Sequence, residues 1–381
     1  MSEYKFPGIN LLNDSPDTGK YQDPQTVLQM KSRLQNLFDL FKLNVKVVDS
    51  QSMTIAVLFK IKLGDGITAK TVRSYKSDIE AAMEDSIEFK DDDENENIVY
   101  ITIRDMKRPR IALKEIIHSS DFMNCKSLLP IAAGMDFSGG KLIIDLEEIN
   151  NLLVIGVTGS GKSVFLSDII TSIMFRARPE EVQFIFLDFK GVELPLFNNI
   201  PHLIVPSVKT AQGAMHELDR LVDVANKRLY LLAKANKNSF SEYNRSAKEP
   251  LPEIVLIADE YMTLMESTPK ERSHFTDIVK KLATSTEQTG IHLVLATQRP
   301  SAGIISTEIS EAIPHRVSFF VRSGIDSRIA INRTGAQRLL GEGDMIYANI
   351  KSEKGTHAQA ALITDEEIDR LIQFYNDQLM D

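Results

Sequence analysis

The chain has 381 residues, 43% of them apolar, which is enough for one large hydrophobic core and a smaller second domain. Its single cysteine, Cys125, excludes an intramolecular disulfide framework and a metal site built from clustered thiolates. The net charge of -9 excludes a uniformly basic coat for nucleic acid, although a local basic surface is compatible with it. The sequence shows no leader pattern and no apolar run as long as a membrane helix. We therefore expect a cytoplasmic protein that does not insert into a membrane.

Residues 1–120 have the pattern of a small α+β domain. The segment 23–41 spaces its apolar residues at helical intervals and starts with a proline that suits a first helical turn. Two stretches rich in β-branched residues follow at 44–63 and 96–105, and a second helical pattern at 68–83 separates them. This order of elements predicts a compact unit of strands and helices.

From Lys141 onward, short apolar runs alternate with longer amphipathic segments. The apolar runs are LLVIG, FIFLD, IVLIAD, HLVLAT, VSFFV and DMIYA. Such alternation predicts β-α units around a mostly parallel sheet that is buried on both faces. We therefore expect residues 121–381 to form an α/β domain.

The segment GVTGSGKS, Gly156 to Ser163, fits GxxxxGK[ST] at every fixed position and lies between a strand pattern and a helix pattern. Its glycines let backbone N–H groups curl around phosphate, Lys162 neutralises phosphate oxygens, and the Ser163 hydroxyl can coordinate Mg²⁺. This context favours a site for ATP and Mg²⁺ over an ordinary glycine turn. The residues expected to hold the nucleotide are Gly156, Val157, Thr158, Gly159, Ser160, Gly161, Lys162, Ser163 and Val164.

A second motif, EIVLIADEY, ends an apolar strand pattern in two acids. Asp259 would hold Mg²⁺ through its water shell, and Glu260 would polarise the attacking water, because phosphoryl transfer depends on positioning and charge neutralisation. A third strand pattern, HLVLATQRP, ends in Thr297 and Gln298; Gln298 would sense the γ-phosphate, and a turn glutamine is the alternative. The motifs predict an ATPase. Its catalytic residues would be Lys162, Asp259, Glu260 and Gln298, and its metal ligands Ser163 and Asp259.

These motifs resemble the FtsK/SpoIIIE-type DNA translocases, which are RecA-like P-loop ATPases that assemble as rings around double-stranded DNA. The resemblance covers residues 152–347, where the family's segments occur in the family's order. Those segments include LDFKGVEL, IPHLIVPSV, IVLIADEYMTLM, GIHLVLATQRPS and GAQRLLGEGDMIY. A weaker resemblance of residues 27–121 suggests the family's small ring-stacking domain. The resemblance implies a ring-stacking α+β domain over 1–120 and a RecA-like P-loop motor domain with a mostly parallel sheet over 121–381.

The resemblance also implies a homo-oligomer, a hexameric ring, that pumps double-stranded DNA by hydrolysing ATP between subunits, where a neighbour's arginines stabilise the transition state. Glu287 stands where family members carry such an arginine, three residues before the GIH run. Hydrolysis is then slow, or another residue substitutes. The possible substitutes are Arg299, Arg316, Arg322, Arg328 and Lys281.

The segment 298–340 carries six arginines against three acidic residues, in a chain that is acidic as a whole. Such a surface suits DNA phosphates, with an affinity that is independent of sequence and sensitive to salt; surface and interface ion pairs are the alternative. Ser310 and Gly324 stand where the family usually has lysine. The candidates for DNA contact are Arg299, Arg322 and Arg328.

The pattern shows neither the family's membrane region nor its winged-helix module. We therefore expect either the motor part of a longer protein or a compact relative. Chromosome partition in cell division and the handling of phage or mobile-element DNA both stay open as its process. A membrane or recombinase partner stays unknown. Two other functions remain open: a conjugation- or secretion-type coupling ATPase, and a nucleotide-gated ring scaffold with weak hydrolysis, which Glu287 would explain.

Overall fold

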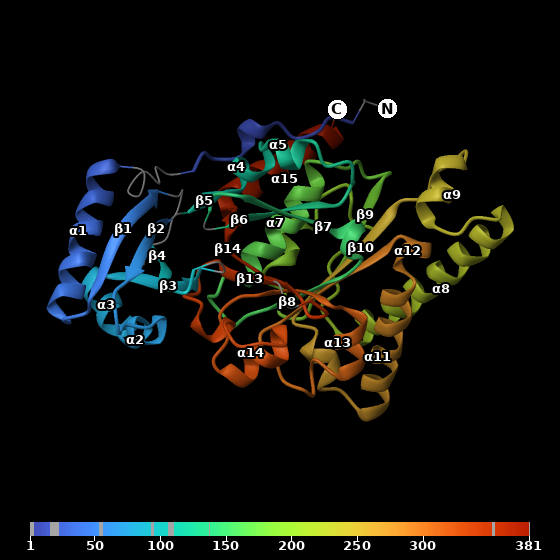
Figure 1. Ribbon diagram of the computed structural model, residues 1–381. Coiled ribbons are helices and arrows are strands. Elements are labelled where there is room, and N and C mark those ends of the chain that lie inside the picture. Colours follow the sequence, from blue (N-terminus) through green and yellow to red (C-terminus); the bar gives the residue numbers. More distant parts are fainter. Residues whose placement is uncertain are drawn as a thin grey trace. The chain divides into compact units, whose positions relative to one another are not determined.

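The computed structural model of the protein describes residues 4–15, 23–52, 56–92, 95–105, 110–136, 138–352 and 355–380. The chain divides into two compact units (Figure 1). The smaller unit comprises residues 15–111 and 135–140, and the larger comprises residues 1–14, 112–134 and 141–381. The division into domains 1–120 and 121–381 stays a prediction.

The smaller unit is a four-stranded antiparallel sheet packed against helices, as the sequence predicts. Its strands, in the order β1-β2-β4-β3, are β1 (Val45–Ser52), β2 (Ala56–Leu63), β3 (Asp85–Asp91) and β4 (Ile98–Asp105). Its helices are α1 (Pro24–Leu40), α2 (Ala69–Ser74) and α3 (Lys76–Met83). Helix α1 begins where the Asp23 carboxylate accepts hydrogen bonds from the backbone amides of Gln25 and Thr26. Side chains such as Phe38 and Phe59 fill the core between α1 and the sheet.

The larger unit is built on a ten-stranded sheet. Strand β5 pairs with β14, and the other nine follow the order β7-β6-β14-β13-β12-β8-β11-β10-β9. Strands β9, β10, β11, β8 and β12 are mutually parallel, whereas β12, β13 and β14 pair antiparallel. The strands are β5 (Ile111–Ala112), β6 (Pro130–Asp136), β7 (Lys141–Asp145), β8 (Leu152–Ile155), β9 (Val182–Asp188), β10 (Glu253–Asp259), β11 (Ile291–Thr297), β12 (His315–Ser318), β13 (Asp344–Asn349) and β14 (Gly355–Leu362).

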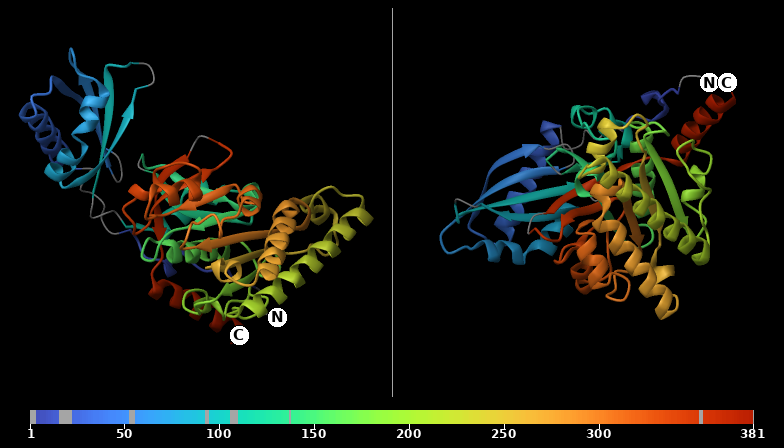
Figure 2. Two further views of the ribbon diagram at one scale, coloured as in Figure 1. Left: turned by 90° about the horizontal axis from the view of Figure 1, so that it is seen from below. Right: turned by 90° about the vertical axis from the view of Figure 1, so that its right-hand side faces the viewer.

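Helices cover both faces of this sheet, α7 and α15 on one and α8, α11, α13 and α14 on the other (Figures 1 and 2). Every residue of β8 and β11 is accordingly buried, which explains why these strands read as continuous apolar runs. The helices are α4 (Leu113–Ile117), α5 (Ser120–Met123), α6 (Leu146–Ile149), α7 (Lys162–Met174), α8 (Ala211–Ala235), α9 (Phe240–Ser246), α10 (Met262–Met265), α11 (Pro269–Thr284), α12 (Thr286–Thr289), α13 (Thr307–Ala312), α14 (Gly324–Ile331) and α15 (Asp365–Met380).

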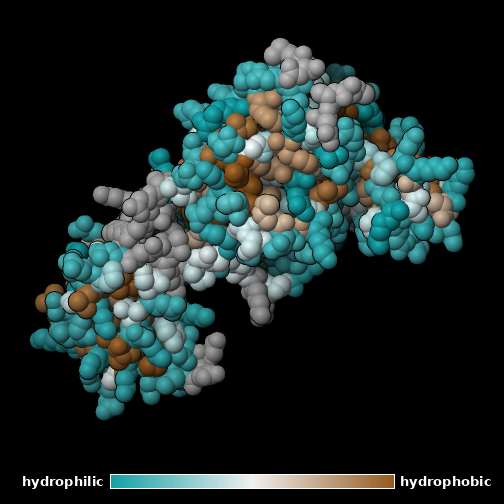
Figure 3. Space-filling model, turned by 90° about the horizontal axis from the view of Figure 1, so that it is seen from above, coloured by the Kyte–Doolittle hydropathy of each residue, from teal (hydrophilic) through white to brown (hydrophobic). Residues whose placement is uncertain are grey.

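Polar side chains dominate the surface in Figure 3, and apolar patches occur on both units. In the smaller unit, Leu28 and Leu40 of α1 are 63% and 73% exposed. Within the described ranges, no helix combines the length and the apolar character needed to cross a membrane.

The N-terminal segment 4–13 is tied to the C-terminal helix α15 within the larger unit. The backbone amide of Asn13 donates to a Glu367 carboxylate oxygen at 2.7 Å, and Glu367 is almost fully buried. The Arg370 guanidinium donates to the carbonyl oxygen of Leu11 at 2.9 Å. The first described residues thus form part of the larger unit, although the residues that follow them belong to the smaller one.

Helix α7 carries a fully buried carboxyl, that of Asp168. Burial raises the pKa of this carboxyl well above its usual range, the Glu367 carboxylate raises it further, and the backbone amide of Ile363 partly offsets both effects. The neutral form of Asp168 is therefore the one that the fold favours.

We expect the substitution Asp168→Asn to weaken the pH dependence of stability. The folded chain binds the Asp168 proton more tightly than the unfolded chain, so the free energy of unfolding falls as pH rises above about 4, the usual pKa of an aspartate. Asparagine cannot ionise and removes this contribution. Differential scanning fluorimetry should give a smaller fall in Tm for Asp168→Asn than for the wild type, whereas Asp369→Asn, at an exposed carboxyl of α15, should keep the wild-type fall. Equal slopes for all three proteins would contradict the assignment.

Candidate active site

The loop between β8 and α7 has the backbone of a phosphate-binding loop. Gly159 and Gly161 have φ angles of 77° and 109°, which glycine adopts readily and other residues do not. A Cβ on Gly161 would lie 2.6 Å from the backbone nitrogen of Gly343, so a larger residue has no room there. Lys162 begins the 13-residue helix α7, with Ser163 and Val164 half-buried in its first turn. The amides and the partial positive charge of this helix end fit an anionic phosphate.

The segment before β13, which lies far from this loop in the sequence, packs against it. The backbone amide of Gly343 donates to the carbonyl oxygen of Ser160 at 2.8 Å, and the amide of Ala360 donates to the Gly343 carbonyl at 2.8 Å. The Gln359 side chain donates to the Glu342 carbonyl at 2.9 Å. The string GEGD, quoted above only as part of the resemblance, therefore packs directly against the phosphate-binding loop.

Lys162 and Asp259 form a buried ion pair at the carboxyl edge of the sheet. The Lys162 ammonium donates to Asp259 Oδ1, and the two side chains are 3% and 1% exposed. Each charge stabilises the other, because both side chains are buried and water does not solvate them. Removal of one partner alone would therefore leave a buried unpaired charge. The structure thus brings together Lys162, which the sequence predicts for phosphate binding, and Asp259, which it predicts for metal binding.

Glu260 follows Asp259 in a left-handed conformation, with φ of 61°, which costs a non-glycine residue on the order of 1–3 kcal/mol. Its side chain is buried. Glu260 Oε1 accepts hydrogen bonds from the Thr297 hydroxyl at 3.0 Å and from the Gln298 backbone amide at 3.1 Å. Glu260 Oε2 lies 3.4 Å from the Lys190 ammonium. The strained backbone aims the carboxylate at the ends of the two strands that flank β10.

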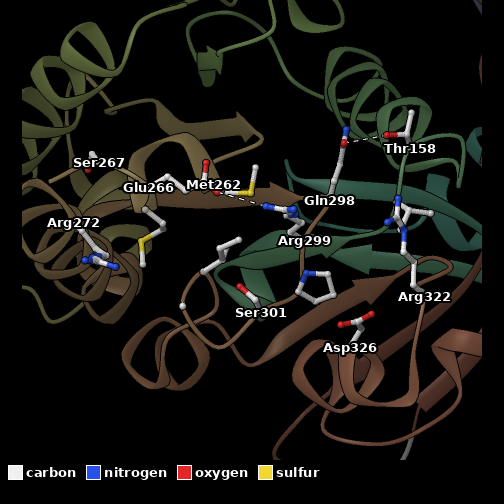
Figure 4. A pocket seen from close by; sticks show the side chains of 15 residues that line it. Thr158, Met262, Glu266, Ser267, Arg272, Gln298, Arg299, Ser301, Arg322 and Asp326 are labelled. Atoms are coloured by element: carbon white, nitrogen blue, oxygen red, sulfur yellow. Dashed lines mark hydrogen bonds and ion pairs between the residues drawn. The ribbon is translucent and has the colours of Figure 1, made fainter. Parts of the chain in front are cut away.

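Gln298 connects the two motifs, because β11 lies between β8 and β10 in the sheet. The Thr158 hydroxyl in the phosphate-binding loop donates to Gln298 Oε1 at 3.0 Å (Figure 4). The backbone amide of Gln298 donates to Glu260 Oε1. The four residues predicted to be catalytic therefore lie along neighbouring strand ends. Their roles stay predictions.

A cavity of about 760 Å³ opens beside these strand ends. Thr158 and Gln298 line it together with three arginines, Arg272, Arg299 and Arg322. Figure 4 shows these arginines on separate chain segments around the cavity, and the Arg299 guanidinium lies 3.7 Å from a Glu266 carboxylate oxygen. Two of the three arginines predicted to contact DNA thus lie next to the phosphate-binding loop. The third, Arg328, is exposed on α14.

Asp188, at the end of β9, organises the loop that follows it. This fully buried carboxylate accepts hydrogen bonds from five consecutive backbone amides at 2.8–3.2 Å. The donors are Lys190, Gly191, Val192, Glu193 and Leu194. In the sequence, this loop is part of the string LDFKGVEL, which supports the family resemblance but does not by itself predict the role of Asp188.

Arg316 differs from the other arginines of its segment because it is buried, at 1% exposure. Its guanidinium donates to the carbonyl oxygens of Ile329 and Ala330 at 2.8 and 2.7 Å and to the Ser310 hydroxyl at 2.6 Å. Burial lowers the pKa of Arg316 to about 10, so the group stays charged at neutral pH. Ser310 thus serves as an acceptor for a buried cation. Glu287, by contrast, is exposed on α12.

Family models match both parts of the chain. The model described as FtsK/SpoIIIE family matches residues 112–302, and the FtsK alpha domain matches residues 6–103. The chain is 33% identical to the DNA translocase FtsK of Clostridium tetani over 99% of its own length and 51% of that protein. It is also 33% identical to the DNA translocase FtsK of Caldanaerobacter subterraneus subsp. tengcongensis, over 98% of this chain and 52% of that one. The chain spans about half the length of these relatives.

Solved structures share the fold at lower identity. The conjugation coupling protein TcpA of pCW3, in a monomer form with ATPγS, superposes with a TM-score of 0.63 at 22% identity, covering 91% of this chain and 99% of that one. The Type VII secretion ATPase EccC of Thermomonospora curvata gives a TM-score of 0.59 at 21% identity, over 70% of this chain and 34% of that one. With the motifs gathered at one sheet edge and the family model matching through all three of them, the chain belongs to the FtsK/SpoIIIE family of ATPases.

Proposed function

We propose that this protein is an ATP-driven motor that moves double-stranded DNA. We also propose that it works as a homo-oligomeric ring, which the family resemblance implies is a hexamer. The observation that carries the proposal is the convergence of Lys162, Asp259, Glu260 and Gln298 on adjacent strand ends. The near full-length similarity of the chain to proteins named DNA translocase FtsK supports DNA as the substrate. The proposal extends to a cytoplasmic role in chromosome partition, or in the handling of phage or mobile-element DNA.

The residues divide the nucleotide chemistry among them. Lys162 and the loop amides would neutralise the phosphates, and Ser163 and Asp259 would hold Mg²⁺, which when bound neutralises charge on the phosphate oxygens. Glu260 would orient and polarise the attacking water. Gln298 would report the γ-phosphate, because it bonds to the phosphate-binding loop and to Glu260 at once.

The local charge of the segment 298–340 supports contact with DNA phosphates. Arg299 and Arg322 are exposed beside the nucleotide loop, and Arg328 is exposed on α14. The exposed apolar residues of α1 suit the ring-stacking role that the resemblance implies for the smaller unit. Burial makes Arg316 unavailable to a neighbouring subunit, which leaves exposed cations to replace the arginine missing at Glu287. They are Arg299, Arg322, Arg328 and Lys281.

A second function, a coupling ATPase for conjugation or secretion, is favoured by the fold similarity to TcpA over most of both chains. The two functions differ in their requirements. A DNA motor responds to naked duplex, whereas a coupling ATPase needs a membrane partner. The nucleotide-gated scaffold, motivated by the exposed Glu287, predicts almost no turnover with Mg²⁺ and DNA.

The ATPase rate should rise with duplex concentration and length at low salt, and the stimulation should fall steeply as salt increases. Lys162→Ala should lower the stimulated rate roughly a hundredfold or more, because it removes a charge aimed at the transferred phosphate. A coupled-enzyme assay measures both, and sedimentation with nucleotide reports the ring. An ATPase that duplex DNA fails to stimulate at low salt would reject the translocase, and a monomer under all conditions would reject the ring.

Substitution of the buried Arg316 should affect protein stability, whereas substitution of the exposed Arg328 should affect the stimulation of the ATPase by DNA. Arg316→Met should lower the free energy of unfolding by about 2–4 kcal/mol, since it leaves the acceptors of α13 and α14 unpaired. Arg328→Met should change that free energy by less than about 0.5 kcal/mol and reduce the stimulation by DNA. Urea unfolding and the ATPase assay test the pair. A destabilised Arg328→Met with unchanged DNA response would reverse the assignment.

A further inference from the structure

Glu260 has no oxygen free of partners in this structure. One carboxylate oxygen is held by Thr297 and Gln298 at the end of β11, and the other faces the ammonium of Lys190 at 3.4 Å. A carboxylate oxygen that is paired with an ammonium is a poorer acceptor for the proton of a water molecule. The contact with Lys190 therefore weakens Glu260 Oε2 as an acceptor for water, and opening of that contact would strengthen it.

Lys190 is the contact that can open most readily. Its side chain is 41% exposed, whereas Thr297 and Glu260 are buried. Water can replace the ammonium at Glu260 without the cost of burying a new unpaired group, and an ion pair with one exposed partner is weak. The hydrogen bonds from β11, in contrast, come from a strand that is buried along its whole length.

The fold holds the backbone of Lys190 in place. Lys190 is the first of the five residues whose amides bind the buried Asp188 carboxylate, so the start of its side chain is fixed while its ammonium can swing. Strand β9, which ends in Asp188, pairs directly with β10, which ends in Asp259 next to Glu260. The pairing of β9 with β10 therefore places the Lys190 ammonium next to Glu260.

We propose that Lys190 is a positioning residue that restrains Glu260 and keeps ATP hydrolysis slow in the absence of DNA. The inference rests on the proposed function, since it assigns a regulator to the same glutamate. Removal of the ammonium frees Glu260 Oε2 to accept from water. The restraint acts on the chemical step and leaves the phosphate contacts of the loop untouched.

The test compares four proteins without DNA: the wild type, Lys190→Met, Lys190→Arg and Lys209→Met. Lys190→Met should raise the DNA-free kcat about two- to fivefold, equal to about 0.4–1 kcal/mol in the barrier, with an unchanged KM for ATP. Lys190→Arg keeps the charge and should behave as the wild type. Lys209, an exposed lysine that lies along the same loop at Gly191, is the matched control, and Lys209→Met should leave the rate unchanged.

A DNA-free kcat for Lys190→Met at or below that of the wild type would overturn the proposal, as would an equal rise in Lys209→Met. Because the readout needs no DNA, it is separate from the test of translocation. A chain whose ATPase ignores duplex DNA, yet accelerates on Lys190→Met, would contradict the motor and support the restraint. If duplex DNA stimulates the wild type but Lys190→Met does not raise the DNA-free kcat, the motor is supported and the restraint is contradicted.

Discussion

Four charged side chains, Lys162, Asp188, Asp259 and Glu260, are almost completely buried at one edge of a parallel sheet. A buried charge is tolerated only when partners replace its lost water, and at this edge the strand ends and the loops after them provide those partners. Asp259 has Lys162, Asp188 has a row of amides, and Glu260 has β11. The architecture of the site follows from this demand, because these partners come from the start of α7, from the loop after β9 and from the end of β11.

The parallel arrangement of the strands brings these partners close together. Parallel strands bring their carboxyl ends to one edge of the sheet, and helices cover both of its faces. The insertion of β11 between β8 and β10 gives the phosphate-binding loop and the acids a shared neighbour. One dipeptide, Thr297-Gln298, then contacts both.

Much of this could be predicted from the sequence where the physics is local. The apolar runs predict the buried strands, and the glycine spacing predicts a phosphate-binding loop, in which the structure shows positive φ angles at Gly159 and Gly161. The packing of Gly343 on that loop depends on which distant strands become neighbours, and no short window of sequence carries that information. The same holds for the amide row on Asp188 and for the burial of Arg316, which composition alone placed among surface cations.

The strap of residues 4–13 along α15 has a consequence for how the chain can be cut. Most of the smaller unit, residues 15–111, lies between the strap and α4, and residues 135–140 belong to it as well, so the smaller unit is inserted within the sequence of the larger unit. A fragment that starts after residue 111 would lose the partners of Glu367 and Arg370 and would expose one side of α15. A deletion that joins the strap directly to the start of α4 would keep them.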